Sequence, residues 1–356
     1  MNIGAFGSSY IECRRKIVDS GSAALAHHRA IPHPLPGPAG EPLFCDVLTL
    51  GDPGAEAVLV VESGLHGAEG PAGSAVQVAA LQILTPPPGV ALVIVHAINP
   101  WGFAWNRRFN EDNIDLNRHF VDWDAPGDLS NEGYDAIADA VIPEGPDAAS
   151  MARSNAVLDA FRAEKGEAAL KSALKLGQYR HPDGLYFGGA GPSWSSRLVE
   201  TLAREYLGQA RRAGLIDIHT GLGPYGFGEC LSGETPTSDE GRRAAAWYGA
   251  VAHTKAPETG YAGSKASILD GWRRAAPWLT LTPIGLEFGT LDPDAVRDAV
   301  RVDGWLHANG GRDNPAWDQV KAGMSAAYNP ADPAWQQAVV TRGLEVVRQG
   351  LAGLSA

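Results

Sequence analysis

Apolar positions along the chain form short runs that alternate with longer helix-like stretches. The runs over 43–50, 57–62, 90–96, 215–218 and 279–287 are rich in Val, Leu and Ile, as strands buried on both faces are. The helix-like stretches cover 10–28, 71–84, 151–176, 194–213, 236–253, 292–307 and 334–351. Because a strand, a Gly-rich turn, a helix and a second strand follow one another over 57–96, the pattern is that of a βαβ unit. The sequence therefore predicts one α/β domain over residues 1–356, with a central mixed, mostly parallel sheet between two layers of helices.

Composition adds many turns to this scaffold. The 356 residues include 43 Gly and 25 Pro, while the hydrophobic fraction, 44%, is ordinary for a globular protein. The excess follows no repeat, so it predicts long loops and tight turns on a folded core. Binding and catalytic groups concentrate in such loops.

Charge and cysteine content exclude several classes of partner. Lys and Arg number 29 against 41 Asp and Glu, which gives a net charge of −12 with no basic cluster. Nucleic acid and anionic membranes are therefore not expected partners. The three cysteines are too few and too widely spaced for a disulfide framework, and the N-terminus lacks the order of a signal peptide. We expect a reduced, soluble, cytoplasmic protein; its oligomeric state is not readable from the sequence.

Two of the predicted strands end in potential metal ligands. His66 and Glu69 lie three positions apart in a glycine-lined turn after the strand 57–62, and His219 follows the strand 215–218. Two imidazoles and one carboxylate form a ligand set that catalytic zinc uses, with a fourth position open for water. Asp115 and Asp217 are candidate acceptors for the second nitrogen of each imidazole.

Further polar groups fall near the same strand ends. The block Arg107–Arg118 is dense in Arg, Asn and Asp, and both Arg108 and Arg118 offer guanidinium groups to a carboxylate or an oxyanion. Glu287 is the one carboxylate in the apolar strand 279–287. Burial would raise its pKa toward the value that suits a general base.

Each of these features also has an ordinary structural explanation. A lone His-x-x-Glu is often a local hydrogen bond, a histidine after a strand is often a core residue, and Arg/Asn-rich runs are usually solvated loops. The segment 221–226 matches Gly-x-Gly-x-x-Gly, but Pro224 and Tyr225 enter a strand-like stretch instead of the helix that a dinucleotide site needs. The joint occurrence of the four features, in order, favours a catalytic site.

That order resembles the zinc carboxypeptidase family of metallopeptidases, and the loop over 219–226 resembles that of a bacterial branch of the family. The family pattern is His-x-x-Glu, an Arg-x-Asn…Asp-Leu-Asn-Arg block, a distant His after a strand, and a late Glu. All four parts are present between about residues 58 and 290, although Asn113 replaces a glycine of the family block. The wider superfamily also includes aspartoacylase-like deacylases. The resemblance implies a three-layer carboxypeptidase-like fold and one Zn²⁺ per chain.

The resemblance also implies a role for each matching residue. His66, Glu69 and His219 correspond to the zinc ligands, and Asp115 to the aspartate that orients the first histidine. Arg108 corresponds to the arginine that stabilises the oxyanion, and Glu287 to the general base and acid. The pair that holds the substrate carboxylate corresponds to Asn117 and Arg118. The family's mobile tyrosine has three candidates in the interval between His219 and Glu287, namely Tyr225, Tyr248 and Tyr261.

The sequence thus predicts a zinc-dependent hydrolase that cleaves an amide or peptide bond next to a free carboxylate. Metal-activated water would attack the carbonyl, with Glu287 as the general base. The expected substrate is a peptide or an N-acyl amino acid. Two alternatives stay open: an aspartoacylase-like deacylase of small N-acyl amino acids, and a non-catalytic protein that binds peptides or carboxylates.

Overall fold

A mixed sheet organises the chain. In the computed structural model, residues 3–52, 54–254 and 266–355 are described, and they form one eight-stranded sheet of order β1-β2-β4-β3-β5-β8-β6-β7. Its strands are β1 (His27–Pro32), β2 (Phe44–Leu50), β3 (Ala57–Ser63), β4 (Val90–His96), β5 (Arg212–Tyr225), β6 (Gly228–Ser232), β7 (Val251–His253) and β8 (Thr280–Gly289). The central pairs β4/β3, β3/β5 and β5/β8 are parallel, and an antiparallel pair lies on each side of them. The predicted α/β class and mixed sheet are confirmed.

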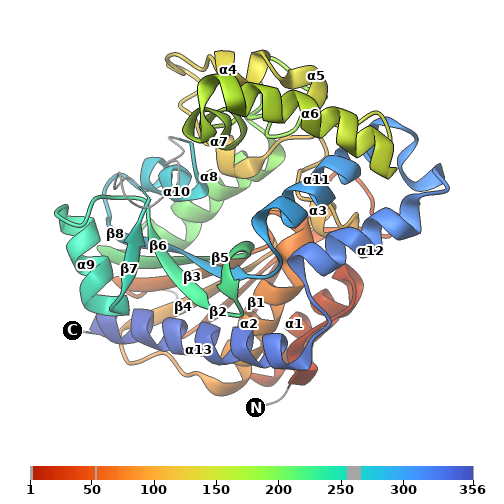
Figure 1. The fold of residues 1–356 in the computed structure, drawn as a ribbon. Coiled ribbons are helices and arrows are strands. Elements are labelled where there is room, and N and C mark those ends of the chain that lie inside the picture. The colour runs from red at the N-terminus through yellow and green to blue at the C-terminus, as the bar shows by residue number, and fades with distance from the viewer. Residues whose placement is uncertain (1–2, 53, 255–265, 356) are drawn as a thin grey trace.

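Helices cover both faces of the sheet, which is why its central strands are apolar throughout. All seven residues of β3 and all seven of β4 are buried. One face packs against α2 (Gly70–Ile83) and α13 (Pro333–Ser355), and the other against α8 (Trp194–Leu207) and α10 (Ile268–Ala275). The helices α1 (Tyr10–Ala23) and α9 (Asp239–Tyr248) pack against the α2–α13 layer. Figure 1 shows α13, in dark blue, running below the sheet.

A separate group of helices lies beyond the sheet. It comprises α4 (Glu132–Asp135), α5 (Ala138–Val141), α6 (Ala148–Lys165), α7 (Glu167–Lys175), α11 (Pro293–Ala308) and α12 (Trp317–Tyr328), which share a third apolar cluster. Figure 1 shows α4–α7 gathered on the side of the sheet away from α13. Shorter helical segments are η1 (Ile3–Ala5), η2 (Gly67–Glu69), α3 (Pro100–Ala104), η3 (Leu116–Arg118) and η4 (Gly311–Asp313). Within the described ranges, no helix has the length and apolar character that crossing a membrane requires.

Several boundaries differ from the sequence prediction. The first helix ends at Ala23, and residues 27 and 28, predicted to end that helix, begin the edge strand β1. The helix predicted over 151–176 is two helices, because Gly166 adopts φ 91° between them. The strand predicted over 215–218 extends from 212 to 225, and the helix predicted before it ends at Leu207. The segment 221–226 therefore does not begin a helix, which agrees with the exclusion of a dinucleotide site.

Candidate metal centre and its cavity

His66 and Glu69 project from the turn that joins β3 to α2. After β3 ends, the short helix η2 runs directly into α2, where Pro71 occupies the first turn. Gly67 sits against the backbone of Gly102, and a Cβ on Gly67 would lie 1.9 Å from the Gly102 carbonyl carbon. Only glycine fits at that position, so the tight turn that aims both ligands depends on it.

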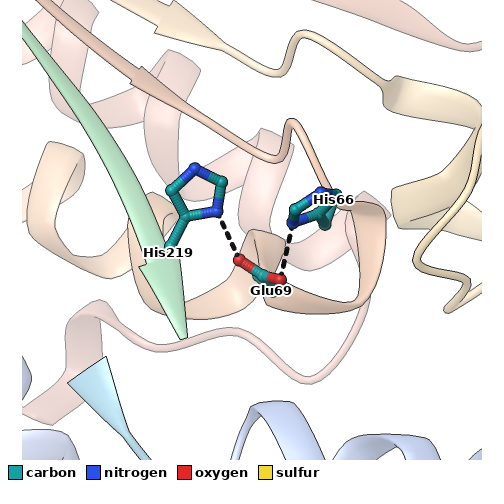
Figure 2. A group of neighbouring side chains, drawn as sticks. All are labelled: His66, Glu69 and His219. Carbon is teal, nitrogen blue, oxygen red and sulfur yellow. Dashed lines mark hydrogen bonds and ion pairs between the residues drawn. The ribbon is translucent and has the colours of Figure 1, made fainter. Parts of the chain in front are cut away.

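His219 reaches the same point from β5, the strand next to β3. One nitrogen of each imidazole faces Glu69: His66 Nδ1 lies 2.8 Å from Oε1, and His219 Nδ1 lies 2.9 Å from Oε2. Figure 2 shows the two rings on either side of the carboxylate. One ligand atom from each of the three residues lies within 4.8 Å of the others, and all three side chains are buried. The cluster is compatible with one metal ion.

The second nitrogen of each imidazole faces a buried aspartate. His66 Nε2 lies 3.1 Å from Asp115 Oδ1, and His219 Nε2 lies 2.5 Å from Asp217 Oδ2. This arrangement fixes the orientation of each ring and leaves Nδ1 for a metal, as in carboxylate–histidine–zinc sites. Burial would raise the pKa of Asp115, but Arg108 and His66 outweigh it and hold that pKa well below its usual range. Asp115 is therefore a permanent anion beside the first ring.

Behind Asp217 lies a second buried acid, Glu62 on β3. The two are register partners on neighbouring parallel strands. Glu62 Oε2 accepts a hydrogen bond from Trp272 Nε1 at 2.8 Å, whereas its Oε1 and Asp217 Oδ1 have no hydrogen-bond partner among the described residues. Burial, and then the charge of Asp217, raise the pKa of Glu62 well above its usual range. The raised pKa favours the neutral form of the Glu62 carboxyl, which limits charge repulsion between the two acids.

Arg108 is held over the centre by two acids. Its Nε donates to Asp115 Oδ2 at 3.1 Å and its Nη1 to Glu69 Oε1 at 3.4 Å. The loop that carries it is tied to η2, because the Ala68 amide donates to the Arg107 carbonyl at 2.9 Å. The guanidinium is largely buried, with 14% of the side chain exposed. A fixed cation beside His66, Glu69 and His219 can stabilise negative charge that develops there.

Glu287 enters the cavity from β8, opposite His219 in the strand register. It accepts a hydrogen bond from the Leu222 amide at 3.1 Å. Burial raises the pKa of Glu287 to about 7, with Glu69 adding to the rise and His219 opposing it. A carboxyl group with that pKa can both take up and release a proton near neutral pH.

Asn117 and Arg118 line the cavity next to Arg108. Asn117 Oδ1 accepts from the Ile268 amide at 3.2 Å. The Arg118 guanidinium donates to two carbonyls, that of Lys175 at 2.6 Å and that of Asn117 at 2.8 Å. The cavity has a volume of about 330 Å³ and contains every sequence-predicted site residue except Asp115, which lies behind it.

The model of one known protein family matches nearly the whole chain. Residues 6–342 match the family described as "Protein of unknown function (DUF2817)". The chain belongs to this family. No curated protein matches it. The DUF2817 match extends beyond the motif-bearing region, 58–290, at both ends.

Solved structures similar to this DUF2817 chain include three hydrolases. Carboxypeptidase A from Helicoverpa armigera is 14% identical, with a TM-score of 0.47 and coverage of 92% of this chain and 76% of that one. An aspartoacylase family protein from Mesorhizobium loti is 17% identical (TM-score 0.38, coverage 80% and 67%). A succinylglutamate desuccinylase from a Silicibacter species is 13% identical (TM-score 0.41, coverage 80% and 67%). At these values the likeness does not assign an activity to the DUF2817 chain.

The tyrosine candidates fall in different places. Tyr225 is exposed and donates to Asp332 Oδ2 at 2.7 Å, and Tyr248 is buried in the core beneath the sheet. Tyr261 lies outside the described residues. Two other tyrosines line the cavity, Tyr186 and Tyr328, and both lie outside the interval that the motif order indicated. Nothing in their local sequence marks them, since their proximity to Arg108 arises from tertiary packing.

The structure shows how asparagine fits at position 113, where the zinc carboxypeptidase motif has glycine. It adopts φ 58°, a left-handed conformation that glycine favours and that asparagine tolerates best among other residues. Its side chain adds contacts that glycine lacks. Oδ1 accepts from Arg107 Nη2 at 3.0 Å, and Nδ2 donates to the carbonyls of Pro182 at 2.9 Å and Gly184 at 3.0 Å. Asparagine thus keeps the left-handed backbone conformation and adds three side-chain hydrogen bonds.

Proposed function

We propose that this protein is a zinc-dependent hydrolase that cleaves an amide or peptide bond next to a free carboxylate. The observation that carries the proposal is the convergence of two imidazole nitrogens and the Glu69 carboxylate within 4.8 Å, in one cavity with Arg108 and Glu287. Two histidines and one glutamate form a catalytic zinc set, and His66, Glu69 and His219 would hold the ion. When bound, zinc would polarise a carbonyl group and activate a water molecule.

The chain's own residues supply the proton transfers and the orientation. Glu287 takes a proton from the attacking water and returns it to the leaving nitrogen as the C–N bond breaks, so that it ends the cycle in its starting state. Arg108 donates hydrogen bonds to the oxygen that becomes negative during attack. Asn117 and Arg118 bind the substrate carboxylate and thereby place the scissile bond.

A small substrate is favoured over a long peptide. The cavity volume of about 330 Å³ is near the lower end for small-molecule sites. One wall consists of residues from α6 and α7, from Arg162 to Lys175. This observation supports deacylation of N-acyl amino acids as the second candidate function, with the same residues in the same roles.

Metal analysis of the purified protein beside His66→Ala tests the proposal. We expect about one zinc per chain in the parent and loss of that zinc in the variant, with both proteins folded by circular dichroism. The zinc-loaded parent should then hydrolyse members of a panel of dipeptides and N-acyl amino acids with free carboxylates. An absence of bound metal after zinc reconstitution, or an inactive zinc-loaded protein on every member of the panel, would contradict the proposal.

A further inference from the structure

Most charged side chains that line the cavity are paired with a neighbour of opposite charge. At the rim, Glu167 lies 2.8 Å from Arg162 and 3.7 Å from Lys171, and Asp294 lies 2.7 Å from Arg297. Pairs of this kind compensate each other and leave no net demand for a charged ligand. Deeper in the cavity, Arg108 is paired with acids as described above.

Three lining residues differ from this pattern. Among the described ranges 3–52, 54–254 and 266–355, no oppositely charged side chain lies within 4.0 Å of Arg118, Lys175 or Glu287. The proposed function uses Glu287 as the base and Arg118 for the substrate carboxylate. Lys175 is a third unpaired charge, and no step of that function uses it.

Lys175 is the last residue of α7 and shares a corner of the cavity with Arg118. Its carbonyl accepts the 2.6 Å hydrogen bond from Arg118 Nε, so the two cations are joined through the backbone. Burial, and then Lys171 and Arg118, lower the pKa of the half-buried Lys175 ammonium, while Glu287 opposes the shift. Two neighbouring cations that are partly removed from water are costly unless an anion joins them.

We propose that Lys175 binds a second anionic group of the substrate, which would therefore carry two: a carboxylate at Arg118 and Asn117, and another anionic group at Lys175. The inference rests on the proposed function and names the substrate class, an acidic N-acyl amino acid or peptide. Leu174 and Leu170, one and five residues before Lys175 on α7, line the same cavity. Their apolar surface suits the methylene groups that separate two anionic groups in such a molecule.

Matched substrate pairs that differ only in charge test the inference. One pair has Glu or Gln as the leaving amino acid, and the other has a succinyl acyl group or its terminal amide. We expect the zinc-loaded parent to prefer the acid of at least one pair about tenfold or more in kcat/KM, chiefly through KM, because a charged hydrogen bond is lost with the amide. The pair that shows the preference identifies which side of the scissile bond carries the second group.

Variants at one position and a matched control separate binding from folding. Lys175→Met should abolish the preference, and Lys175→Arg should retain it. Lys165→Met makes the same change on α6 at an exposed lysine outside the cavity and should leave the preference intact. A parent without preference for either acid, or a Lys175→Met variant that keeps the preference, would overturn the inference.

A binding measurement separates this inference from the proposed function. Calorimetric binding of both matched pairs, each acid beside its amide, to Glu287→Gln does not depend on turnover. Tighter binding of the acid, lost in the double variant with Lys175→Met, would support the inference even if the parent hydrolysed none of the panel. Equal binding of acid and amide in both pairs, alongside normal hydrolysis by the parent, would reject the inference while leaving the hydrolase assignment in place.

Discussion

The two sides of the cavity are built in different ways. The strand floor, which comprises the carboxyl ends of β3, β5 and β8, presents His219 and Glu287 from strands buried on both faces. The helical wall, which comprises α6 and α7 (residues 148–175), buries only three residues on each helix and exposes most of the rest. Groups that need exact placement thus lie on the most constrained elements. Lys175, which we propose recognises a second anionic group, lies on the wall, where substitutions disturb little else.

This division has an energetic basis. The floor side chains His219 and Glu287 are buried and face the cavity, so a change there alters packing, charge and hydrogen bonds together. The wall rests on the separate apolar cluster that it shares with α4, α5, α11 and α12. We therefore expect substitutions on the floor to change the chemical step or metal binding, and substitutions on the wall to change substrate preference.

The largest effect is expected for Glu287→Gln on the strand floor. The amide cannot accept the proton from water, so kcat should fall by about 10³-fold, within the range typical of lost acid–base catalysis. Zinc content and thermal stability should stay close to those of the parent. Glu164→Gln, an exposed change on α6, is the matched control and should keep parental kcat. Retention of most activity in Glu287→Gln would remove this residue from the role of base.

A smaller effect is expected for Asp115→Asn, which leaves every proposed ligand in place. The neutral amide supports the His66 ring less well, and zinc affinity should fall about 10–100-fold, as for other partners of ligand histidines. Competition with a chelator measures the change. Asp135→Asn on α4, whose carboxylate pairs with Arg180 and His181, is the control and should bind zinc as the parent does. Equal affinities in Asp115→Asn and the parent would show that Asp115 does not orient His66.

The smallest effect concerns Glu62 and the pH dependence of stability. Because its pKa is raised in the folded state, the native protein keeps a proton that the unfolded chain releases above about pH 4.5, the ordinary value. That contribution to stability is complete below pH 4.5 and is lost as the pH rises, by up to about 1.4 kcal/mol per pH unit until the folded pKa is reached.

Urea unfolding of the metal-free proteins between pH 5 and 8 measures this loss. Glu62→Gln should not show this loss. The free energy of unfolding of the variant, relative to that of the parent, should therefore increase as the pH rises. Glu56→Gln changes an exposed glutamate that pairs with Arg211 and should follow the parent at every pH. Parallel curves for Glu62→Gln and the parent would indicate an ionised Glu62.

The parts of the fold that the sequence predicted are those with strong local signals. The strand predicted over 90–96 coincides with β4, because burial on both faces requires an unbroken apolar run. The edge strands β1 and β7 were not predicted, since β1 reads HHRAIP with mostly exposed residues and β7 has three residues. Pairing with a neighbour, not their own composition, makes them strands.

The residues of the candidate site also differ in whether the sequence could predict them. His66 and Glu69 share one turn, and His219 follows a strand, so their clustering could be predicted from spacing and fold class. The proposed role of Lys175 could not, because it depends on the absence of an acid within 4.0 Å among the residues that the structure describes, which only the folded chain reveals. Glu62 lay within a correctly predicted strand, but its relation to Asp217 depends on the register between β3 and β5.

The Asn113 side chain joins two segments near the cavity by hydrogen bonds that glycine at the same position could not make. One amide holds Arg107 on one side and the carbonyls of residues 182 and 184 on the other. Arg107 in turn is anchored to Asp303 on α11 at 3.1 Å. The segment around residue 182 is thus linked by hydrogen bonds, through Asn113 and Arg107, to the residue next to Arg108. We expect Arg108, which lies beside the proposed metal ligands, to depend for its position partly on this segment outside the cavity floor.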